Sequence, residues 1–255
     1  MSCEVLRTEN LYKSFSIGDN TVSAVRDVSL FVGKNEVVGL VGESGCGKST
    51  LARLITRLDF PDRGEIILCG ENISRASGRE LRRACKNIKM IFQEPRSSFD
   101  PRLTLGASIR ETLKMTEKMT AKEYRDKSVD LLRQVGLDES YGHMKPTDIS
   151  GGECQRAAIA RALAGAPKLL ICDEATSALD VSIQAQILEL LRMVQKETGM
   201  SVLFISHDLA LVSSFCARTY VMNNGKIVEQ GETRRIINEP QNDYTKALIA
   251  SVLPI

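Results

Sequence analysis

The chain has 255 residues, of which 26% are charged, and its 34 basic and 32 acidic side chains leave a net charge of +2. This length supports one large α/β domain or two small ones, with enough core to be stable without staples such as disulfides. Because the two signs of charge are interspersed, no long polycationic face is present to attract nucleic acid, and we expect no nucleic-acid partner.

Signals for membrane insertion and export are missing from the sequence. No apolar run approaches the roughly 18 to 20 residues that cross a bilayer, and residues 1–4 lack a charged-then-apolar signal pattern. Seven cysteines without a C-x-x-C pair suit a reducing cytoplasm better than a disulfide framework. We therefore expect a soluble chain that is not exported.

The first 35 residues have the pattern of β-strands. Residues 4–35 alternate polar and apolar side chains around turn signals at 17–20 and 32–35. This pattern predicts short antiparallel strands that wrap beside an α/β core. Residues 65–70 predict a further strand of the same kind.

A glycine-rich loop follows the first continuous apolar run. Residues 36–41 predict a buried strand, and residues 48–55 predict a helix. The loop between them fits the pattern G-x-x-x-x-G-K-[ST] and is followed by Thr50; its residues are Gly42, Glu43, Ser44, Gly45, Cys46, Gly47, Lys48 and Ser49. In such a loop backbone N–H groups close around phosphate oxygens, the lysine charge faces the β and γ phosphates, and the final hydroxyl ligates Mg²⁺. The sequence therefore predicts a site for a nucleoside triphosphate and Mg²⁺.

The middle and later parts of the chain predict a helical insertion followed by more buried strands. Helical spacing with many Lys and Glu residues extends from about 103 to 134 and predicts a helical subdomain inserted between two halves of the α/β core. Continuous apolar runs resume at 169–172 and 201–205, as expected of strands buried on both faces. Polar residues follow each run, at 173–174 and 206–208. Because ligands lie beyond the carboxyl ends of parallel strands, we expect these residues and the glycine loop to form one site.

The acidic pair Asp173 and Glu174 has chemistry suited to hydrolysis. One carboxylate can hold Mg²⁺ through water, and the other can polarise an attacking water. An acidic pair at a strand end is common by itself. Downstream of a phosphate loop it indicates a nucleotide hydrolase.

A second glycine motif, residues 150–156, opens a predicted helix that continues over residues 157–163. Ser150, Gly151 and Gly152 at its N-terminus make another anion site. One chain therefore has two surfaces for a γ-phosphate, and two chains arranged head to tail would use both. Both glycine motifs contain a cysteine whose oxidation or alkylation would block activity; the alternative for these thiols, Cys46 and Cys154, is that they are small buried side chains.

In this order, the motifs resemble the ATP-binding subunit of an ABC (ATP-binding cassette) transporter, over nearly the whole chain. The loop is then the Walker A loop, and Asp173 and Glu174 are the Walker B acids. Residues 150–156 are similar to the family signature, with Glu153 where glutamine is more usual. The other roles that the resemblance implies are adenine stacking by Phe15, Mg²⁺ contact and partner sensing by Gln93, a D-loop at Ser177, Ala178, Leu179 and Asp180, and a γ-phosphate contact by His207.

Three of these residues have simpler alternatives. Phe15 can be an ordinary core aromatic, Gln93 a solvated strand end, and His207 a structural histidine. The order of the motifs favours the functional role for each. The other histidine, His143, has no motif around it and is assigned no role.

Four stretches narrow the resemblance to the oligopeptide, dipeptide and nickel importer branch: residues 42–50, 92–101, 177–186 and 242–248. Members of that branch often pair two non-identical ATPase subunits, so the second ATP-binding subunit is another copy or a paralogue. The tail stops at Ile255, as in shorter nickel-type members, which weakens any claim for peptides. The resemblance also implies permease subunits in the membrane, an indirect extracytoplasmic solute-binding protein, and a peripheral location on the cytoplasmic side of the cell membrane.

The expected fold is α/β, a P-loop NTPase (RecA-like) core with a flanking antiparallel β-subdomain and an inserted helical subdomain. Within one ATP-binding domain over 1–255, residues 1–90 and 165–235 form the core with its β-subdomain, about 91–164 form the helical subdomain, and 236–255 form a short tail. The expected function is ATP hydrolysis that powers import. The alternative is a soluble ABC-type ATPase that scaffolds a non-transport complex, and the co-purifying partners distinguish the two.

Overall fold

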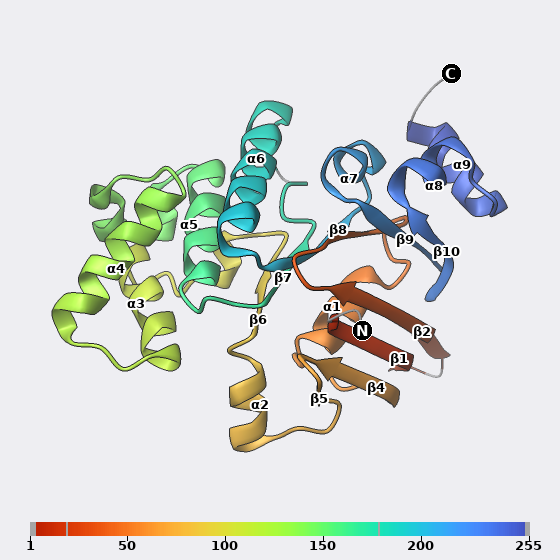
Figure 1. Cartoon of the computed structure of the whole chain (residues 1–255), viewed down its shortest axis with the longest axis horizontal. Coiled ribbons are helices and arrows are strands. Elements are labelled where there is room, and N and C mark those ends of the chain that lie inside the picture. Colours follow the sequence, from red (N-terminus) through yellow and green to blue (C-terminus); the bar gives the residue numbers. More distant parts are fainter. Residues whose placement is uncertain (1–3, 19, 178, 253–255) are drawn as a thin grey trace.

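Two β-sheets and a layer of helices make up the fold, as Figure 1 shows. The computed structural model describes residues 4–18, 20–177 and 179–252, without the side chains of Ile17 and Val252. A six-stranded sheet crosses the middle of the molecule, the four-stranded sheet lies on one side of it, and most helices lie on the other (Figure 1). Within the described ranges, no helix is both long enough and apolar enough to cross a membrane.

The six-stranded sheet is parallel except for its edge strand β10, and its strand order is β10-β9-β3-β8-β7-β6. Its inner strands are apolar throughout because both faces are covered. In β8, Val202 and Phe204 join the core beneath the helices, whereas Leu203 and Ile205 join the core shared with the four-stranded sheet. The strands are β3 (Val37–Val41), β6 (Ile88–Ile91), β7 (Leu169–Asp173), β8 (Ser201–Ser206), β9 (Arg218–Asn223) and β10 (Lys226–Glu232).

The predicted strands at 36–41, 169–172 and 201–205 are therefore confirmed as β3, β7 and β8. The predicted helix after the glycine loop is confirmed as α1 (Lys48–Ile55). Since β3, β8 and β7 are neighbours and run parallel, their carboxyl ends meet at one edge of the sheet. The polar residues that follow these strands are thus brought together, as the sequence predicts.

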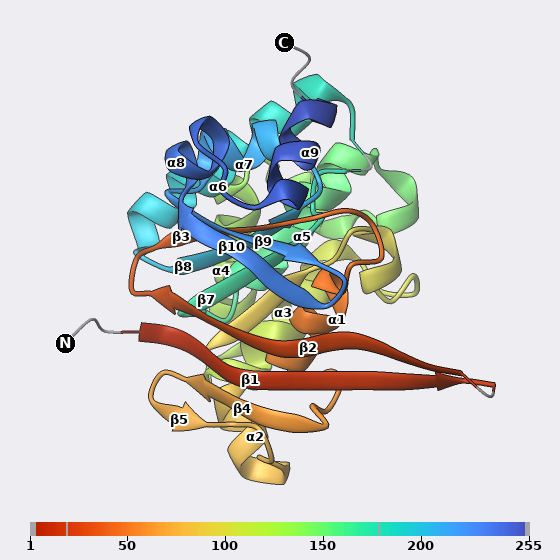
Figure 2. The same ribbon diagram turned by 90° about the vertical axis from the view of Figure 1, so that its right-hand side faces the viewer.

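The four-stranded sheet has the order β2-β1-β4-β5 and is antiparallel. The prediction of short strands is wrong, because β1 and β2 are each 14 residues long and form one extended hairpin (Figure 2). Their pairing shifts register at several places, and each shift breaks the polar-apolar alternation that marks a single strand. The predicted turn at 17–20 includes Asp19, which lies outside the described residues. The strands are β1 (Glu4–Ile17), β2 (Asn20–Gly33), β4 (Arg63–Leu68) and β5 (Glu71–Asn72). Strand β4 overlaps the strand predicted over residues 65–70.

The predicted helical block consists of two helices, α3 (Leu105–Thr116) and α4 (Ala121–Gln134). Thr120 begins α4 with a capping box, in which its side chain and that of Glu123 satisfy each other's backbone N–H groups. These helices pack on α5 (Gly151–Leu163), which in turn contacts the sheet at β6. Short helices lie in the connections: α2 (Gly78–Ala84) between β5 and β6, η1 (Arg96–Ser98) between β6 and α3, and η2 (Glu139–His143) and η3 (Pro146–Asp148) between α4 and α5.

Of the remaining helices, α6 (Val181–Thr198) lies beside α5, and α7 (Leu209–Phe215), α8 (Thr233–Asn238) and α9 (Asp243–Val252) lie toward the β9 and β10 edge of the sheet (Figure 1). Buried side chains of α8 and α9, Ile236 and Leu248, belong to the same core as the helical block. The last described helix is thus packed onto the domain.

An ion pair joins the two sheets. Arg218 of β9 donates to both carboxylate oxygens of Glu36, at 2.9 and 3.0 Å, and to the Phe31 carbonyl on β2, at 2.8 Å. Burial raises the pKa of Glu36, but hydrogen bonds from Arg218 and from the Gly33 N–H outweigh it and lower this pKa overall. The pair therefore holds the long hairpin against the sheet that carries the glycine loop.

Candidate functional site

The glycine loop is closely packed between β9 and β2. A Cβ on Gly42 would lie 2.1 Å from the Met222 carbonyl oxygen, and a Cβ on Gly47 would lie 2.2 Å from the Ala24 carbonyl oxygen. Gly47 also has φ 112°, in the left-handed region that favours glycine. Only glycine fits at either position. The loop's shape therefore follows directly from the two glycines of the pattern.

Helix α1 begins at this loop without a side-chain cap. Its N-cap is Gly47, no side chain accepts from its first N–H groups, and its first turn has no acidic residue. The unpaired N–H groups and the positive end of the helix dipole favour an anion. The loop therefore has the structure of a phosphate site.

Lys48 is buried beneath the loop, with 4% of its surface exposed. Its Nζ donates to the Gly42 carbonyl at 2.7 Å and to the Glu43 carbonyl at 2.9 Å, and it lies 3.9 Å from Glu174 Oε1. A buried ammonium that is held by carbonyls and faces one carboxylate is ready to meet a negative ligand.

Ser49 and Asp173 form the oxygen pair that the sequence assigns to Mg²⁺. Ser49 Oγ donates to Asp173 Oδ1 at 3.1 Å. Burial and the neighbouring Glu174 carboxylate raise the pKa of Asp173, although the Ser49 hydrogen bond opposes this. The Lys48 ammonium also lowers this pKa, but the net shift is upward, so a hard cation beside Asp173 would stabilise its anion. The described residues contain no group of three or more His, Cys, Asp or Glu side chains that could hold a metal. The pair fits Mg²⁺, which is bound through few protein oxygens together with substrate phosphates.

Glu174 and His207 lie at the ends of two adjacent strands. Glu174 has φ 47°, a left-handed conformation, and its N–H donates to the Ile205 carbonyl at 3.0 Å. His207 Nδ1 lies 3.5 Å from Glu174 Oε1, and the imidazole is half-exposed. Residues held in sparsely populated backbone regions cluster at active sites. The carboxylate is therefore rigidly placed between Lys48 and His207.

A cavity of about 270 Å³ brings the predicted residues of three chain segments together. Gln93 follows β6 and lines this cavity. This position favours a role at the site over the alternative that Gln93 is only a solvated strand end. Ala24 of β2 was not predicted; no side-chain pattern marks it, because it contributes backbone. The lining residues are Ala24, Ser44, Gly45, Gly47, Lys48, Ser49, Thr50, Gln93 and Glu174.

The signature residues are not among the described residues that line this cavity. The Ser150 side chain caps α5 by accepting from the Glu153 N–H at 3.3 Å, and the Glu153 carboxylate accepts in return from the Ser150 N–H at 2.8 Å. Tyr141 donates to the same carboxylate at 2.5 Å. Glu153 stands where glutamine is more usual, and its two carboxylate oxygens accept hydrogen bonds from groups of its own chain. A Cβ on Gly152 would lie 2.9 Å from Ile183 of α6, so this glycine allows α5 and α6 to pack closely.

Two other predicted residues lie apart from the cavity. The Asp180 carboxylate caps α6 by accepting from the Ile183 N–H at 3.0 Å, and its D-loop neighbour Ala178 lies outside the described residues. Phe15 is 38% exposed on β1, with the Lys13 ammonium 5.2 Å from its ring centroid. An exposed ring is not a core aromatic and remains free to stack on a base. The nucleotide roles of both residues stay predictions.

The two cysteines of the glycine motifs are poorly accessible. Cys46 is 7% exposed, Cys154 is fully buried, and burial raises the pKa of both thiols. A higher pKa lowers the thiolate population that reacts with oxidants and alkylating agents. These observations favour the alternative of small buried side chains.

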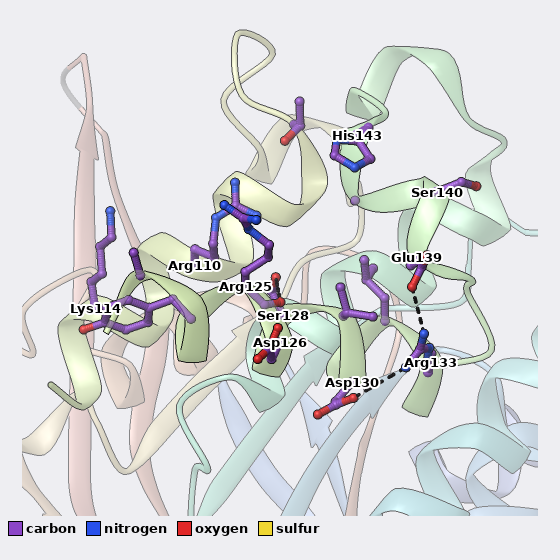
Figure 3. A pocket seen from close by; sticks show the side chains of 16 residues that line it. Arg110, Lys114, Arg125, Asp126, Ser128, Asp130, Arg133, Glu139, Ser140 and His143 are labelled. Carbon is purple, nitrogen blue, oxygen red and sulfur yellow. Dashed lines mark hydrogen bonds and ion pairs between the residues drawn. The ribbon is translucent and has the colours of Figure 1, made fainter. Parts of the chain in front are cut away.

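A larger cavity of about 1230 Å³ lies in the helical block, and none of the predicted site residues lines it. Figure 3 shows its polar lining, with Arg110 and Lys114 from α3, Arg125 from α4, and the ion pair between Arg133 and Glu139 at 2.8 Å. Size alone would favour this cavity as the site. The smaller cavity is preferred, because the buried Lys48 ammonium, the Glu174 carboxylate and the uncapped N-terminus of α1 line it.

Comparisons with known proteins agree with this geometry. A family model described as ABC transporter matches residues 25–177. A probable peptide ABC transporter ATP-binding protein, y4tS, of Sinorhizobium fredii is 45% identical over 98% of this chain and 73% of its own length. The oligopeptide transport ATP-binding protein OppF of Haemophilus influenzae is 45% identical over 91% of this chain and 70% of its own length.

Solved structures show the same fold. The dimeric structure of MJ0796, a bacterial ABC transporter cassette, has a TM-score of 0.82 at 29% identity and covers 90% of this chain and 99% of its own. A dimeric post-hydrolysis state of MJ0796, bound to ADP and Pi, has a TM-score of 0.81 at 29% identity, with the same coverage. The expected α/β cassette fold is confirmed. The chain belongs to the ABC transporter family, as an ATP-binding and ATP-hydrolysing subunit.

Proposed function

We propose that this chain powers an importer of the oligopeptide, dipeptide and nickel branch, as one of two ATP-binding subunits that close head to tail on two MgATP. The relatives are named for peptide, oligopeptide and glutathione transport. Those names favour a peptide-like cargo, and nickel is the less supported alternative. The second subunit is another copy of this chain or a paralogue.

One observation carries the proposal. Lys48, Glu174 and the Ser49–Asp173 pair meet at one sheet edge, whereas the signature residues lie outside the described lining of that cavity. The chain therefore holds each half of a nucleotide site in a different place. A head-to-tail pair joins the halves, and the dimeric MJ0796 structures support that arrangement.

The geometry supports a proposed role for each residue in hydrolysis. Glu174 is placed to orient the attacking water and accept its proton, since the carboxylate is fixed between Lys48 and His207. Lys48 neutralises charge that develops on the γ-phosphate, and His207 donates to it. Ser49, Asp173 and Gln93 would hold Mg²⁺, which supplies charge neutralisation at the phosphates. The partner subunit's Ser150 completes the phosphate cage, because its hydroxyl accepts from Glu153 N–H and still has a proton to donate.

The remaining partners follow from the importer assignment. We place the subunit on the cytoplasmic face of the membrane, bound to permease subunits near Gln93 and the helical block, with a solute-binding protein acting indirectly from the other side. Closure of the two ATP-binding subunits would then move the permeases.

The Glu174→Gln variant tests the catalytic assignment. It keeps the size of the side chain but removes the base, so we expect ATP turnover to fall about 100-fold or more while MgATP binding is retained. The measurement is phosphate release by the purified subunit together with equilibrium nucleotide binding. Glu189→Gln is the matched control, since this exposed α6 carboxylate pairs only with Arg192 among the described residues and should turn over normally. Near-normal turnover by Glu174→Gln would sink the assignment.

Affinity purification of the tagged chain from its native membranes tests the importer assignment. We expect two multi-span permeases and a second ATP-binding subunit to co-purify. Recovery of soluble enzymes alone would overturn transport and favour the scaffold alternative.

A further inference from the structure

The C-terminal helix α9 reaches the phosphate loop. Its start is tied to β10, where the Glu229 carboxylate accepts from the Gln241 N–H at 2.9 Å and the Asn242 N–H at 3.1 Å. The Asn242 side chain then caps the helix by accepting from the Tyr244 N–H at 2.9 Å. Farther along α9, Leu248 is 6% exposed in the core. The helix is therefore fixed at both its start and its inner face.

Tyr244 contacts the loop directly. Its hydroxyl oxygen accepts a hydrogen bond from the Glu43 N–H at 3.0 Å, across 201 positions of sequence. The carbonyl of the same peptide unit belongs to Gly42, and it accepts from Lys48 Nζ at 2.7 Å. One peptide plane is thus held by Tyr244 at its N–H and by Lys48 at its carbonyl.

A peptide unit is planar, so its two ends turn together. Fixing the Glu43 N–H therefore also fixes the direction of the Gly42 carbonyl that receives the Lys48 ammonium. Gly42 is also closely packed on its other side, because a Cβ there would lie 2.1 Å from the Met222 carbonyl oxygen. Hydrogen bonds in such a series also polarise one another.

We propose that Tyr244 is a positioning residue for nucleotide binding, which orients Lys48 through the Gly42–Glu43 peptide and couples α9 to the phosphate loop. The proposal rests on the proposed function, since it assigns Lys48 to the phosphates of ATP. Because coupling is reciprocal, bound nucleotide also stabilises the docked α9. Tyr244 is partly exposed, so water can partly replace its hydroxyl and the expected effect is moderate.

The Tyr244→Phe variant removes the hydroxyl and keeps the ring. We expect Kd for MgATP and MgADP to rise about 3- to 10-fold, the range for one neutral hydrogen bond, with kcat at saturating ATP unchanged. Hydrogen exchange at the Glu43 amide should become faster in the nucleotide-free protein. The matched control is Tyr124→Phe, because the Tyr124 hydroxyl also bonds backbone groups, the Met119 N–H at 3.2 Å and the Glu117 carbonyl at 2.8 Å, but in the helical block.

The outcomes separate this inference from the proposed function. Failure of the wild-type protein to bind MgATP would overturn both. Normal binding by the wild type, with Kd and Glu43 exchange unchanged in Tyr244→Phe, would overturn the inference alone. A fall in kcat with unchanged Kd would also contradict it, because Tyr244 holds the loop and Lys48 before nucleotide binds, whereas bound phosphates hold the Lys48 ammonium in the ATP complex. Leu248→Ala is the second variant: it keeps the hydroxyl but loosens α9, and it should raise Kd if α9 and the loop are coupled.

Discussion

Helices α1 and α5 both begin at a glycine motif, but their first turns are built differently. Gly47 begins α1 with no side-chain cap and no acidic residue, whereas Ser150 begins α5 with a capping box that includes Glu153. The N–H groups of α1 are left for phosphate. Those of α5 are partly satisfied within the chain, and a carboxylate lies beside them.

From this difference we expect the two motifs to contact nucleotide under different conditions. The loop before α1 needs only nucleotide to complete its hydrogen bonds, so it should bind ATP in the isolated subunit. The start of α5 is already stable without a ligand and carries negative charge that opposes phosphate. It should therefore contact nucleotide only when a second subunit presents one.

The largest expected effect comes from the α1 loop. Gly42→Ala places a Cβ against the Met222 carbonyl, so the loop or β9 must shift. We expect MgATP affinity to fall about 100-fold or more and the free energy of unfolding to fall by about 2 to 4 kcal/mol. Isothermal titration and urea unfolding measure the two effects. Gly45→Ala is the control within the loop. Among the described residues beyond its chain neighbours, no atom lies within 4 Å of a Cβ built at Gly45, so the left-handed backbone, at about 1 to 2 kcal/mol, is the main cost. Equal effects of the two variants would contradict the close-packing argument.

A smaller effect is expected at the α5 motif. Ser150→Ala removes the N-cap and the proposed phosphate donor, so the free energy of unfolding should fall by about 1 kcal/mol and ATP turnover by about 10-fold. Nucleotide affinity of the isolated subunit should not change. Thr120→Ala removes an equivalent capping box at α4 and should lose stability without losing turnover. A loss of nucleotide affinity in isolated Ser150→Ala would break the comparison between the two helices.

The smallest effect is a pH dependence confined to α5. Hydrogen bonds from Tyr141 and from Ser150 lower the pKa of Glu153 below its usual value of 4.5. A lowered pKa stabilises the folded state above the usual value, and that stabilisation is lost as pH falls through the folded-state pKa. The wild type should therefore exceed Glu153→Gln in unfolding free energy at pH 7 by more than at pH values well below 4.5, as measured by urea unfolding. A gap that does not change with pH would show that the charge of Glu153 does not stabilise α5.

The sequence predicts the centre of the site better than its surroundings. Gly42 and Glu174 directly follow apolar strands, and Lys48 belongs to the glycine pattern that begins at Gly42. Local pattern and the rule for parallel sheets therefore suffice to bring them together. The lengths of β1 and β2 were not predictable, because register shifts interrupt the alternation along both strands. Tyr244 was noted only as part of a resemblance, and the contact that gives it a role joins residues 201 positions apart. Such a contact depends on how α9 folds back over the sheet, which no local pattern encodes.

The left-handed backbone at Glu174 lowers the stability of the fold at a residue that the proposed ATP hydrolysis requires. A non-glycine residue in this conformation costs about 1 to 3 kcal/mol, and glycine would relieve that strain. Directed evolution for thermostability alone would therefore favour glycine at this position and discard the carboxylate. A screen for a more thermostable variant of this protein should therefore select for ATP hydrolysis at every round, because glycine at this position would remove the proposed base.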